Sequence, residues 1–243
     1  MHNLYWGKIT TLLVSFSFLA STLSGQVTNS SSNLNFWDFK SKPFYFGLTI
    51  GLHSTGYILN KSSEFANSNI RQITTGNNPG LNVNIITNLK IGQYFDFRFI
   101  PGFAFSERNI IFEPRADVPD FENRIRVESV FLEVPLLLRF KSAPYKDKRL
   151  FVVGGMKYSY DVSSTSNTRQ MDAENISTIA PQDFQFEVGA GMQFFFPFFI
   201  FSPELKFSRG LNNIHIFNGN LEGSRAIDQI LSRAFTISLH FEG

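Results

Sequence analysis

Large apolar side chains alternate with small or polar ones along most of the chain after residue 43. From Phe44 to His53, the even positions are large and apolar, whereas the odd positions are small or polar. A period of two residues is typical of a β-strand with one apolar face. The alternation recurs in seven later segments: 81–90, 94–105, 127–140, 150–161, 183–194, 198–208 and 234–242. The pattern therefore predicts eight strands and an all-β protein.

The connections between these segments alternate strictly between long and short. The long ones have 27, 21, 21 and 25 residues, and they are 54–80, 106–126, 162–182 and 209–233. The short ones lie around Ile91, Pro144 and Pro197. Bacterial outer-membrane barrels have short periplasmic turns and longer extracellular loops. We therefore expect an eight-stranded antiparallel transmembrane β-barrel of the outer membrane, with both of its ends on the periplasmic side.

Phenylalanine decides which face of the predicted barrel points inward. The chain has 29 Phe among its 243 residues. Sixteen lie on the apolar face of the predicted strands, namely Phe44, Phe46, Phe95, Phe97, Phe99, Phe103, Phe105, Phe140, Phe184, Phe186, Phe194, Phe199, Phe201, Phe207, Phe235 and Phe241. An eight-stranded barrel is only wide enough for side chains to fill its lumen, so this set is too bulky to point inward. We expect a lipid-facing coat, and the alternative is a soluble barrel or sandwich with an apolar interior.

The first residues have the pattern of an export signal. A weakly basic start, Met1–Lys8, precedes the mostly apolar segment Ile9–Leu23 and the small residues that follow it. We expect a secretory signal peptide at 1–25, a periplasmic lead-in at 26–43 and the barrel at 44–243. A transmembrane anchor is the alternative, but the apolar segment is short for spanning about 30 Å of hydrocarbon.

Composition excludes several kinds of site. With 22 Lys+Arg against 20 Asp+Glu, the net charge of +2 gives no reason to expect nucleic-acid binding. The absence of cysteine excludes disulfides, cysteine-ligated metals and lipids attached through cysteine. No close His/Asp/Glu cluster points to another metal. We therefore expect no metal and no cofactor.

Charged residues also occur on the polar face, which would line the lumen. The candidates are Asp96, Arg98, Glu133, Arg139, Lys157, Glu187, Glu204 and Lys206. A charge buried in a narrow lumen has to be paired, because an isolated one costs several kcal/mol. A structural plug of salt bridges is the favoured interpretation, and a proton or ion path is the alternative. Because eight strands leave no continuous water channel, we expect no conducting pore.

Turn length suggests which lumen charges are paired. If the turn near Pro144 pairs Phe140 with Leu150, Glu133 falls opposite Lys157. If Phe196 and Pro197 form a two-residue turn, Glu187 falls opposite Lys206. Both pairings depend on the register of the strands.

Catalysis would need a nucleophile and a base within hydrogen-bond reach. His53, Ser54, Asp161 and Ser208 all fall near the outer rim of the predicted barrel, and His215 lies in the last long loop. A Ser/His/Asp site is geometrically conceivable there, but no spacing singles it out. We therefore expect no catalytic residues, and a lipid-modifying outer-membrane enzyme is the weaker alternative.

Several segments resemble the PorT family. They are Asn33–Asp38 followed by Phe44–Gly51, then Phe131–Phe140, Gly154–Tyr158 and Ser202–Leu211. The strand with Glu-Val-Pro-Leu-Leu-Leu is shared by a broader class of small barrels, whereas its combination with the last two segments is typical of PorT. The likeness extends over almost the whole of the chain after the signal peptide.

The resemblance implies a function in the type IX secretion system of the Bacteroidota, which exports proteases, adhesins and gliding adhesins. It implies a non-enzymatic outer-membrane barrel with other secretion-machinery proteins and membrane lipids as partners. It implies neither a nucleic-acid partner nor a small-molecule substrate. The alternative is a generic small outer-membrane barrel that binds an external ligand or partner through its loops.

Overall fold

The computed structural model describes residue 35 and residues 39–114, 124–165 and 178–243. These residues belong to one compact unit, Asn35–Gly243. The signal peptide predicted at 1–25 and most of the lead-in predicted at 26–43 lie outside the described residues. Among the described residues, no helix is both long and apolar enough to cross a membrane.

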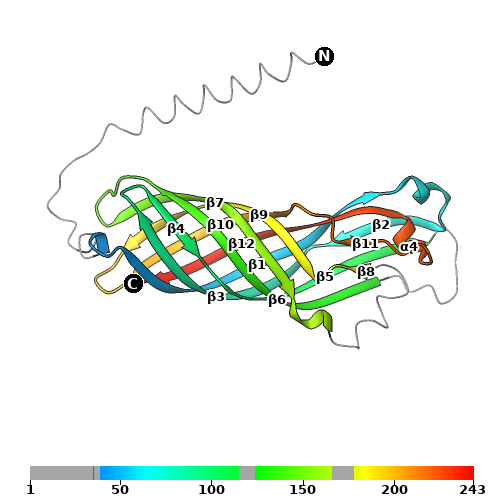
Figure 1. Cartoon of the computed structure of the whole chain (residues 1–243), viewed down its shortest axis with the longest axis horizontal. Helices are drawn as coiled ribbons and strands as arrows, with labels where there is room; N and C mark the ends of the chain where they lie inside the picture. Colours follow the sequence, from blue (N-terminus) through cyan, green and yellow to red (C-terminus); the bar gives the residue numbers. More distant parts are fainter. Residues whose placement is uncertain (1–34, 36–38, 115–123, 166–177) are drawn as a thin grey trace, which may run out of the picture. The chain divides into compact units, whose positions relative to one another are not determined.

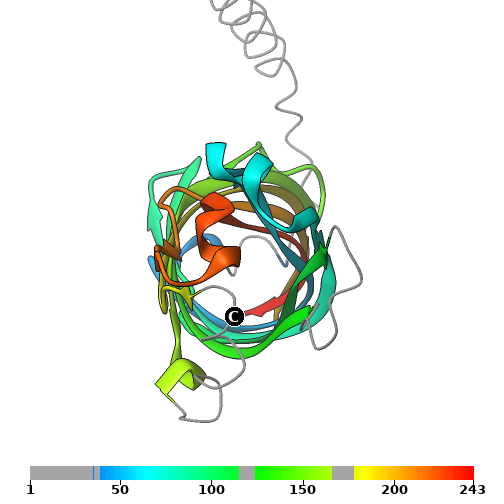
Figure 2. The same cartoon turned by 90° about the vertical axis from the view of Figure 1, so that its right-hand side faces the viewer.

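Antiparallel strands form a closed ring with eight strand positions, which we call walls (Figures 1 and 2). The wall strands are β1 (Phe44–Lys61), β3 (Asn78–Ile91), β4 (Phe95–Phe99), β5 (Gly102–Pro114), β6 (Arg124–Lys141), β7 (Lys148–Asp161), β9 (Gln182–Phe195), β10 (Ile200–Gly210) and β12 (Ile227–Glu242). β4 and β5 are two parts of one wall. The ring closes because β1 pairs with β12 on one side and with β3 on the other. The predicted eight-stranded antiparallel barrel is confirmed.

The third predicted strand, 94–105, is interrupted between β4 and β5. Pro101 lies in the gap and has no backbone N–H to donate. Its carbonyl still accepts a hydrogen bond from Ile85 N at 2.9 Å, and Ile100 N donates to Pro135 O at 3.2 Å. β3 pairs with both parts in one register. The prediction of one continuous strand is wrong only at this point, and the wall itself stays closed.

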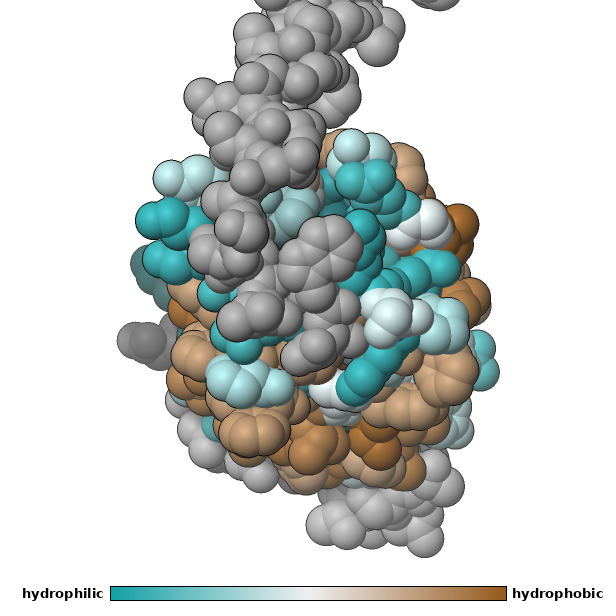
Figure 3. Space-filling model, turned by 90° about the vertical axis from the view of Figure 1, so that its left-hand side faces the viewer, coloured by the Kyte–Doolittle hydropathy of each residue, from teal (hydrophilic) through white to brown (hydrophobic). Residues whose placement is uncertain are grey.

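Large apolar side chains cover the outside of the ring. Of the sixteen Phe on the predicted apolar faces, all but Phe194 and Phe201 are exposed. Leu, Ile and Val alternate with them, for example Leu48, Ile50 and Leu52 on β1. Figure 3, which views the end with the short connections, shows hydrophobic side chains along much of the rim. A continuous apolar surface of this kind is the lipid-facing band of a membrane barrel.

The polarity of the two faces inverts at the end of the ring that carries the long connections, which we call the outer end. On β5 the outward side chains change from Phe105 to Glu107, and the inward ones change from Ser106 to Ile110. The inward side chains there form an apolar outer core of Tyr57, Ile70, Ile73, Ile110, Phe112, Ile214, Ala226, Ile227 and Ile230. Where water replaces lipid outside the ring, apolar groups are driven inward.

The inversion explains why the predicted strands are too short at the outer end of the ring. β1 continues to Lys61 rather than ending at residue 53, and β12 begins at Ile227 rather than at 234. The alternation that marks the membrane segment changes phase at these positions, so the pattern stops although the strand continues. Three short strands were also missed, namely β2 (Ile70–Gly76), β8 (Thr178–Ile179) and β11 (His215–Ile216).

Short elements complete the outer end. They are the 3-10 helices η1 (Ser63–Asn67) and η2 (Val162–Thr165) and the helix α4 (Glu222–Arg225). β8 and β11 pair as a separate two-stranded sheet. Seen from this end in Figure 2, the segment with α4 and β11 lies over part of the ring.

The opposite end, which we call the inner end, carries the short connections and the C-terminus (Figure 1). Phe39 packs there in a small buried cluster with Phe195 and Ile200. Asn35 Nδ2 donates a hydrogen bond to Phe195 O at 3.3 Å, and the Lys90 ammonium donates to Phe39 O. The last part of the predicted lead-in therefore packs against the inner end.

Replacing Leu48 by Arg puts a charge in the middle of the lipid-facing side chains of β1. We expect the free energy of unfolding to fall by about 2–4 kcal/mol, because arginine at the bilayer midplane costs that much on outer-membrane barrels. Urea-induced unfolding in lipid vesicles measures this loss.

Leu211→Arg is the matched control. Leu211 is 55% exposed and Leu48 is 58% exposed, but Leu211 lies just beyond the outer end of β10. Its replacement should cost less than about 1 kcal/mol. Equal losses in the two variants would contradict the lipid-facing position of Leu48.

Candidate functional site

The inward face of the membrane-spanning strands is polar. All eight lumen charges predicted from the sequence point inward, and each is at most 8% exposed. They lie in two networks that are connected through Glu204. Sequence reasoning missed further lumen members near the inner end, which are Tyr45, Asn88, Lys141, Arg149, His240 and Glu242. All six have the inward parity of their strands, so extending each polar face to its strand end identifies them.

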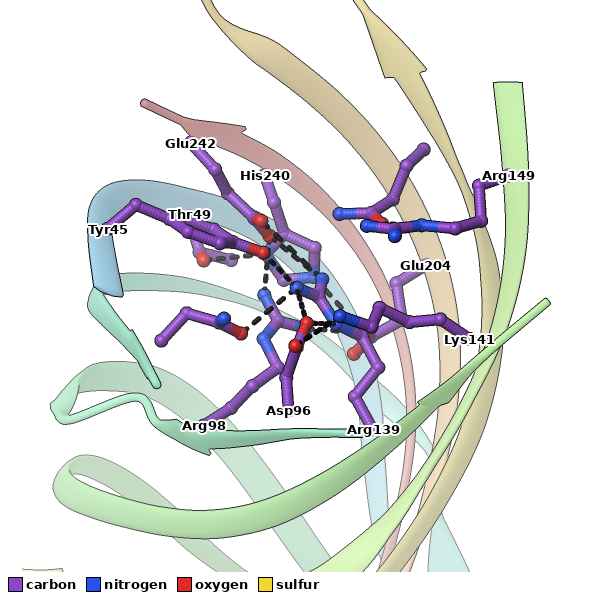
Figure 4. Close-up of polar contacts among 12 residues, drawn as sticks. Tyr45, Thr49, Asp96, Arg98, Arg139, Lys141, Arg149, Glu204, His240 and Glu242 are labelled. Carbon is purple, nitrogen blue, oxygen red and sulfur yellow. Dashed lines mark hydrogen bonds and ion pairs between the residues drawn. The ribbon is translucent and has the colours of Figure 1, made fainter. Parts of the chain in front are cut away.

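Arg139 is the centre of the inner network, which comprises Tyr45, Asn88, Asp96, Arg98, Arg139, Lys141, Glu204, His240 and Glu242 (Figure 4). Its Nη2 donates to Asp96 Oδ2 at 2.7 Å and to Asn88 Oδ1 at 2.9 Å, and also to the Tyr45 hydroxyl. Its Nε donates to Asp96 Oδ2 at 3.1 Å, and its Nη1 lies 3.4 Å from Glu242 Oε1. One guanidinium on β6 thus contacts side chains from four other strands, β1, β3, β4 and β12.

Arg98 makes the second set of contacts in the inner network. Its Nη1 donates to Glu204 Oε2 at 3.0 Å, and its Nη2 donates to Glu242 Oε1 at 2.7 Å. His240 Nε2 lies 3.4 Å from Glu204 Oε2, while its Nδ1 is 2.7 Å from Thr49 Oγ1. Arginine–carboxylate hydrogen bonds of this length are among the strong ones in proteins.

Charge in the inner network is balanced. Lys141 also donates to Asp96, so three carboxylates face three basic side chains, Arg98, Arg139 and Lys141. The next cation toward the inner end is Arg149, which donates to Gln193 Oε1 at 2.6 Å and lies 5.2 Å from the centroid of the Phe195 ring. The three carboxylates and three basic side chains thus offset one another, as buried charges require.

The outer network consists of Glu133, Lys157, Glu187, Lys206 and Ser208. Lys157 Nζ lies 2.7 Å from Glu133 Oε1 and 3.3 Å from Glu187 Oε1. Lys206 Nζ lies 3.1 Å from Glu187 Oε2, and Ser208 Oγ donates to Glu187 Oε1 at 2.8 Å. Glu204 Oε1, at 4.0 Å from Lys206 Nζ, connects this network to the inner one.

The registers predicted for these pairs are wrong by two residues. Lys157 lies opposite Pro135 rather than Glu133, and Glu187 lies opposite Ser208 rather than Lys206. The turn at Pro197 has four residues between β9 and β10 rather than two, and near Pro144 Phe140 pairs with Val152 rather than with Leu150. A shift of two keeps every side chain on its face, so each lysine still reaches its glutamate along the diagonal.

Small residues on the inward face make room for this packing. A Cβ at Gly191 would lie 2.5 Å from Cζ of Phe151, so only glycine leaves space for the ring. Phe151 is buried, and the Arg139 guanidinium lies 5.2 Å from its ring centroid. The ring therefore packs beside the central cation of the inner network.

Side chains fill the lumen beyond these networks as well. The outer network borders a polar cavity of about 10 Å³, whose lining includes His53, Arg108 and Glu133. This is room for roughly one water. The apolar outer core lies on the outer side of the cavity, and fully buried Arg98 and Arg139 lie on its inner side. The arrangement is that of a plugged barrel.

The residues considered for catalysis do not assemble into a triad. His53 Nε2 lies 2.7 Å from Ser106 Oγ, inside the lumen. Asp161 accepts a hydrogen bond from Ser129, and Ser208 donates a hydrogen bond to Glu187. Ser54, which neighbours His53 in sequence, is exposed.

A second histidine–serine contact lies in the outer loops. His215 Nε2 is 2.9 Å from Ser224 Oγ. Partial burial lowers the pKa of His215, and the nearby Asp228 opposes that shift. Ser224 has no exposed surface, so a substrate has no access to its hydroxyl. No group of three or more acidic or histidine side chains that would bind a metal occurs in the described ranges.

Comparison with known proteins gives a family match and several similar structures. The model of a family described as "Outer membrane protein beta-barrel domain" matches residues 16–215. No curated protein matches the chain.

Similar solved structures come from three kinds of bacteria. Neisserial surface protein A is 8% identical with a TM-score of 0.45, over 82% of this chain and 97% of that one. OprG from Pseudomonas aeruginosa is 10% identical with a TM-score of 0.43, over 82% and 96%. Ail from Yersinia pestis is 10% identical with a TM-score of 0.36, over 83% and 100%.

Replacing Arg139 by Met tests the inner network. The change leaves Asp96 and Glu242 without their shared cation, and we expect the free energy of unfolding to fall by about 3–5 kcal/mol. Urea-induced unfolding in lipid vesicles gives the value.

Arg71→Met is the matched control, since Arg71 also forms an ion pair, with Glu113 at 2.8 Å, but its side chain is 69% exposed. An exposed pair contributes about 0–1 kcal/mol. The central position assigned to Arg139 is wrong if its replacement costs no more than that of Arg71.

Proposed function

The chain belongs to the outer membrane protein beta-barrel domain family. We propose that it is a non-enzymatic accessory of type IX secretion that works as a docking component. The signal peptide proposed at 1–25 exports it. The observation that carries the proposal is the filled lumen, in which two ion-pair networks and an apolar outer core occupy the interior. A barrel without an open passage acts through its surfaces.

The choice of secretion rests on the sequence resemblance to PorT. The strand Phe131–Phe140 contributes Glu133 and Arg139 to the lumen networks, and Ser202–Leu211 contributes Glu204 and Lys206. The segments that resemble PorT therefore contribute part of the plug, and Asp96, Arg98 and Glu187 contribute to it from outside them. This agreement supports a shared architecture, and the secretion function follows from it as a hypothesis.

Two surfaces are available to partners. Three lysines are exposed at the inner end. Lys42 follows the packed residue Phe39, Lys146 lies in a short turn, and Lys148 begins β7. This basic surface suits an acidic periplasmic partner of the secretion machinery. At the outer end, the strands continue beyond the lipid-facing band and present the long connections to external partners.

One observation favours a second candidate, a barrel that binds an external partner through its loops. Leu211, Ile216 and Phe217 are exposed at the outer end, beyond the lipid-facing band. Exposed apolar side chains in water are typical of protein-binding surfaces. Loop variants that keep secretion but lose such binding would favour this candidate.

Deleting the gene should abolish export of type IX cargo, which quantitative proteomics of the culture medium measures. A plasmid-borne copy should restore export. Normal secretion in the deletion strain would refute the proposal. Altered lipid A or phospholipid in that strain would instead indicate the enzyme alternative.

The purified barrel should give no steady conductance in a planar lipid bilayer, because its lumen is filled by paired charges and apolar side chains. The measurement is single-channel recording with an applied potential on the order of 100 mV. A stable open channel in the unmodified protein would contradict the plugged lumen on which the proposal rests.

A further inference from the structure

Two arginines lie side by side on the outside of the barrel. Arg209 on β10 and Arg233 on β12 are paired directly across the two strands. They have the same outward parity as Phe207 and Phe235, the pair that lies two residues nearer the membrane centre. Both guanidinium groups therefore project from the outer wall rather than into the lumen.

This arrangement is unfavourable on its own. Like charges directly opposite each other on antiparallel strands are destabilising. Among the described residues, no carboxylate forms an ion pair with Arg209 or Arg233, although Arg98 and Arg139 in the lumen each have carboxylate partners. Within the described ranges, the acceptor of Arg233 is neutral, namely Asn77 Oδ1 at 3.0 Å.

The depth of the pair is set by its neighbours. Phe207 and Phe235, at 44% and 48% exposed, belong to the lipid-facing band. On β5 the outward face changes from Phe105 to Glu107, which marks the outer edge of that band. Arg209 and Arg233 follow the last outward phenylalanines of their own strands, so they lie at the level of the lipid headgroups on the outer side.

We propose that Arg209 and Arg233 together bind a phosphate group of an outer-leaflet lipid. Guanidinium groups bind phosphate through paired hydrogen bonds in a fixed fork geometry. An anion between the two side chains removes their repulsion, and Phe207 and Phe235 contact the acyl chains of the same lipid. This site is independent of the proposed function in secretion, since it concerns how the barrel is held in its membrane.

Lipid retention is the first test. The full-length protein, purified from outer membranes in mild detergent, is analysed by native mass spectrometry for bound phosphorylated glycolipid. R209Q/R233Q should retain about tenfold less than the unmodified protein, given the strength of charge-assisted hydrogen bonds. R209K/R233K, which keeps the charge but loses the fork, should retain an intermediate amount.

R71Q is the control, since Arg71 is an exposed arginine at the outer end whose partner is Glu113. It should retain as much lipid as the unmodified protein. The shift of the folded barrel on unheated SDS gels verifies that each variant is folded. Equal lipid retention in R209Q/R233Q and R71Q would overturn the proposal.

Thermal stability in lipid-free micelles is the second test, and it separates a lipid site from a structural function of the arginines. Without lipid, R209Q/R233Q should melt at the same temperature as the unmodified protein or higher, because the repulsion is gone. Added lipid A should raise the melting temperature of the unmodified protein and not that of the variant.

Inorganic phosphate distinguishes the two sources of the anion. It should stabilise the unmodified protein much less than lipid A does at equal phosphate concentration, since it has no acyl chains to contact Phe207 and Phe235. Equal stabilisation by the two would overturn the assignment to a lipid, and lower stability of the lipid-free variant would assign the arginines a structural function instead.

Discussion

A backbone that crosses hydrocarbon has no water with which to form hydrogen bonds, so every strand in it needs a neighbour on both sides. In this protein β1 meets that requirement by pairing with β12 and β3, which closes the ring. The interruption at Pro101 shows how strict the requirement is. Ile100 and Pro101 still engage the neighbouring walls through Pro135 O and Ile85 N, although proline removes one donor.

Closure with eight strands has a second consequence, because it makes the lumen narrow enough for side chains to fill. The charges inside are then desolvated, and their pairing becomes a condition for folding. Replacing a whole buried ion-pair set by apolar residues is often neutral for stability, whereas removing one partner and leaving the other charge unpaired is strongly destabilising. Glu204 has a special place here, since its two oxygens contact Arg98 in one network and Lys206 in the other.

The sequence correctly predicts those parts of the fold in which a strand has the same surroundings, lipid outside and lumen inside, along its length. In the membrane, alternation between lipid and lumen places the phenylalanines outside and the charges inside, and the structure has the same eight walls. The predicted registers at Lys157 and Glu187 are wrong by two residues, because a shift of two leaves the alternation unchanged and only the conformation of the turn distinguishes the options. The outer parts of β1 and β12 were missed because the environment outside the barrel changes there from lipid to water. The signal peptide and the secretion function stay predictions.

The inversion of polarity along β5 also determines where the barrel stops along the membrane normal. Moving the molecule outward by one residue pair would carry Phe105 toward water, and moving it inward would carry Glu107 toward hydrocarbon. Either displacement is opposed, so the molecule has a preferred immersion depth that is encoded in its own wall. The outer loops are consequently held at a fixed distance from the bilayer surface, so any partner that binds them does so at that distance.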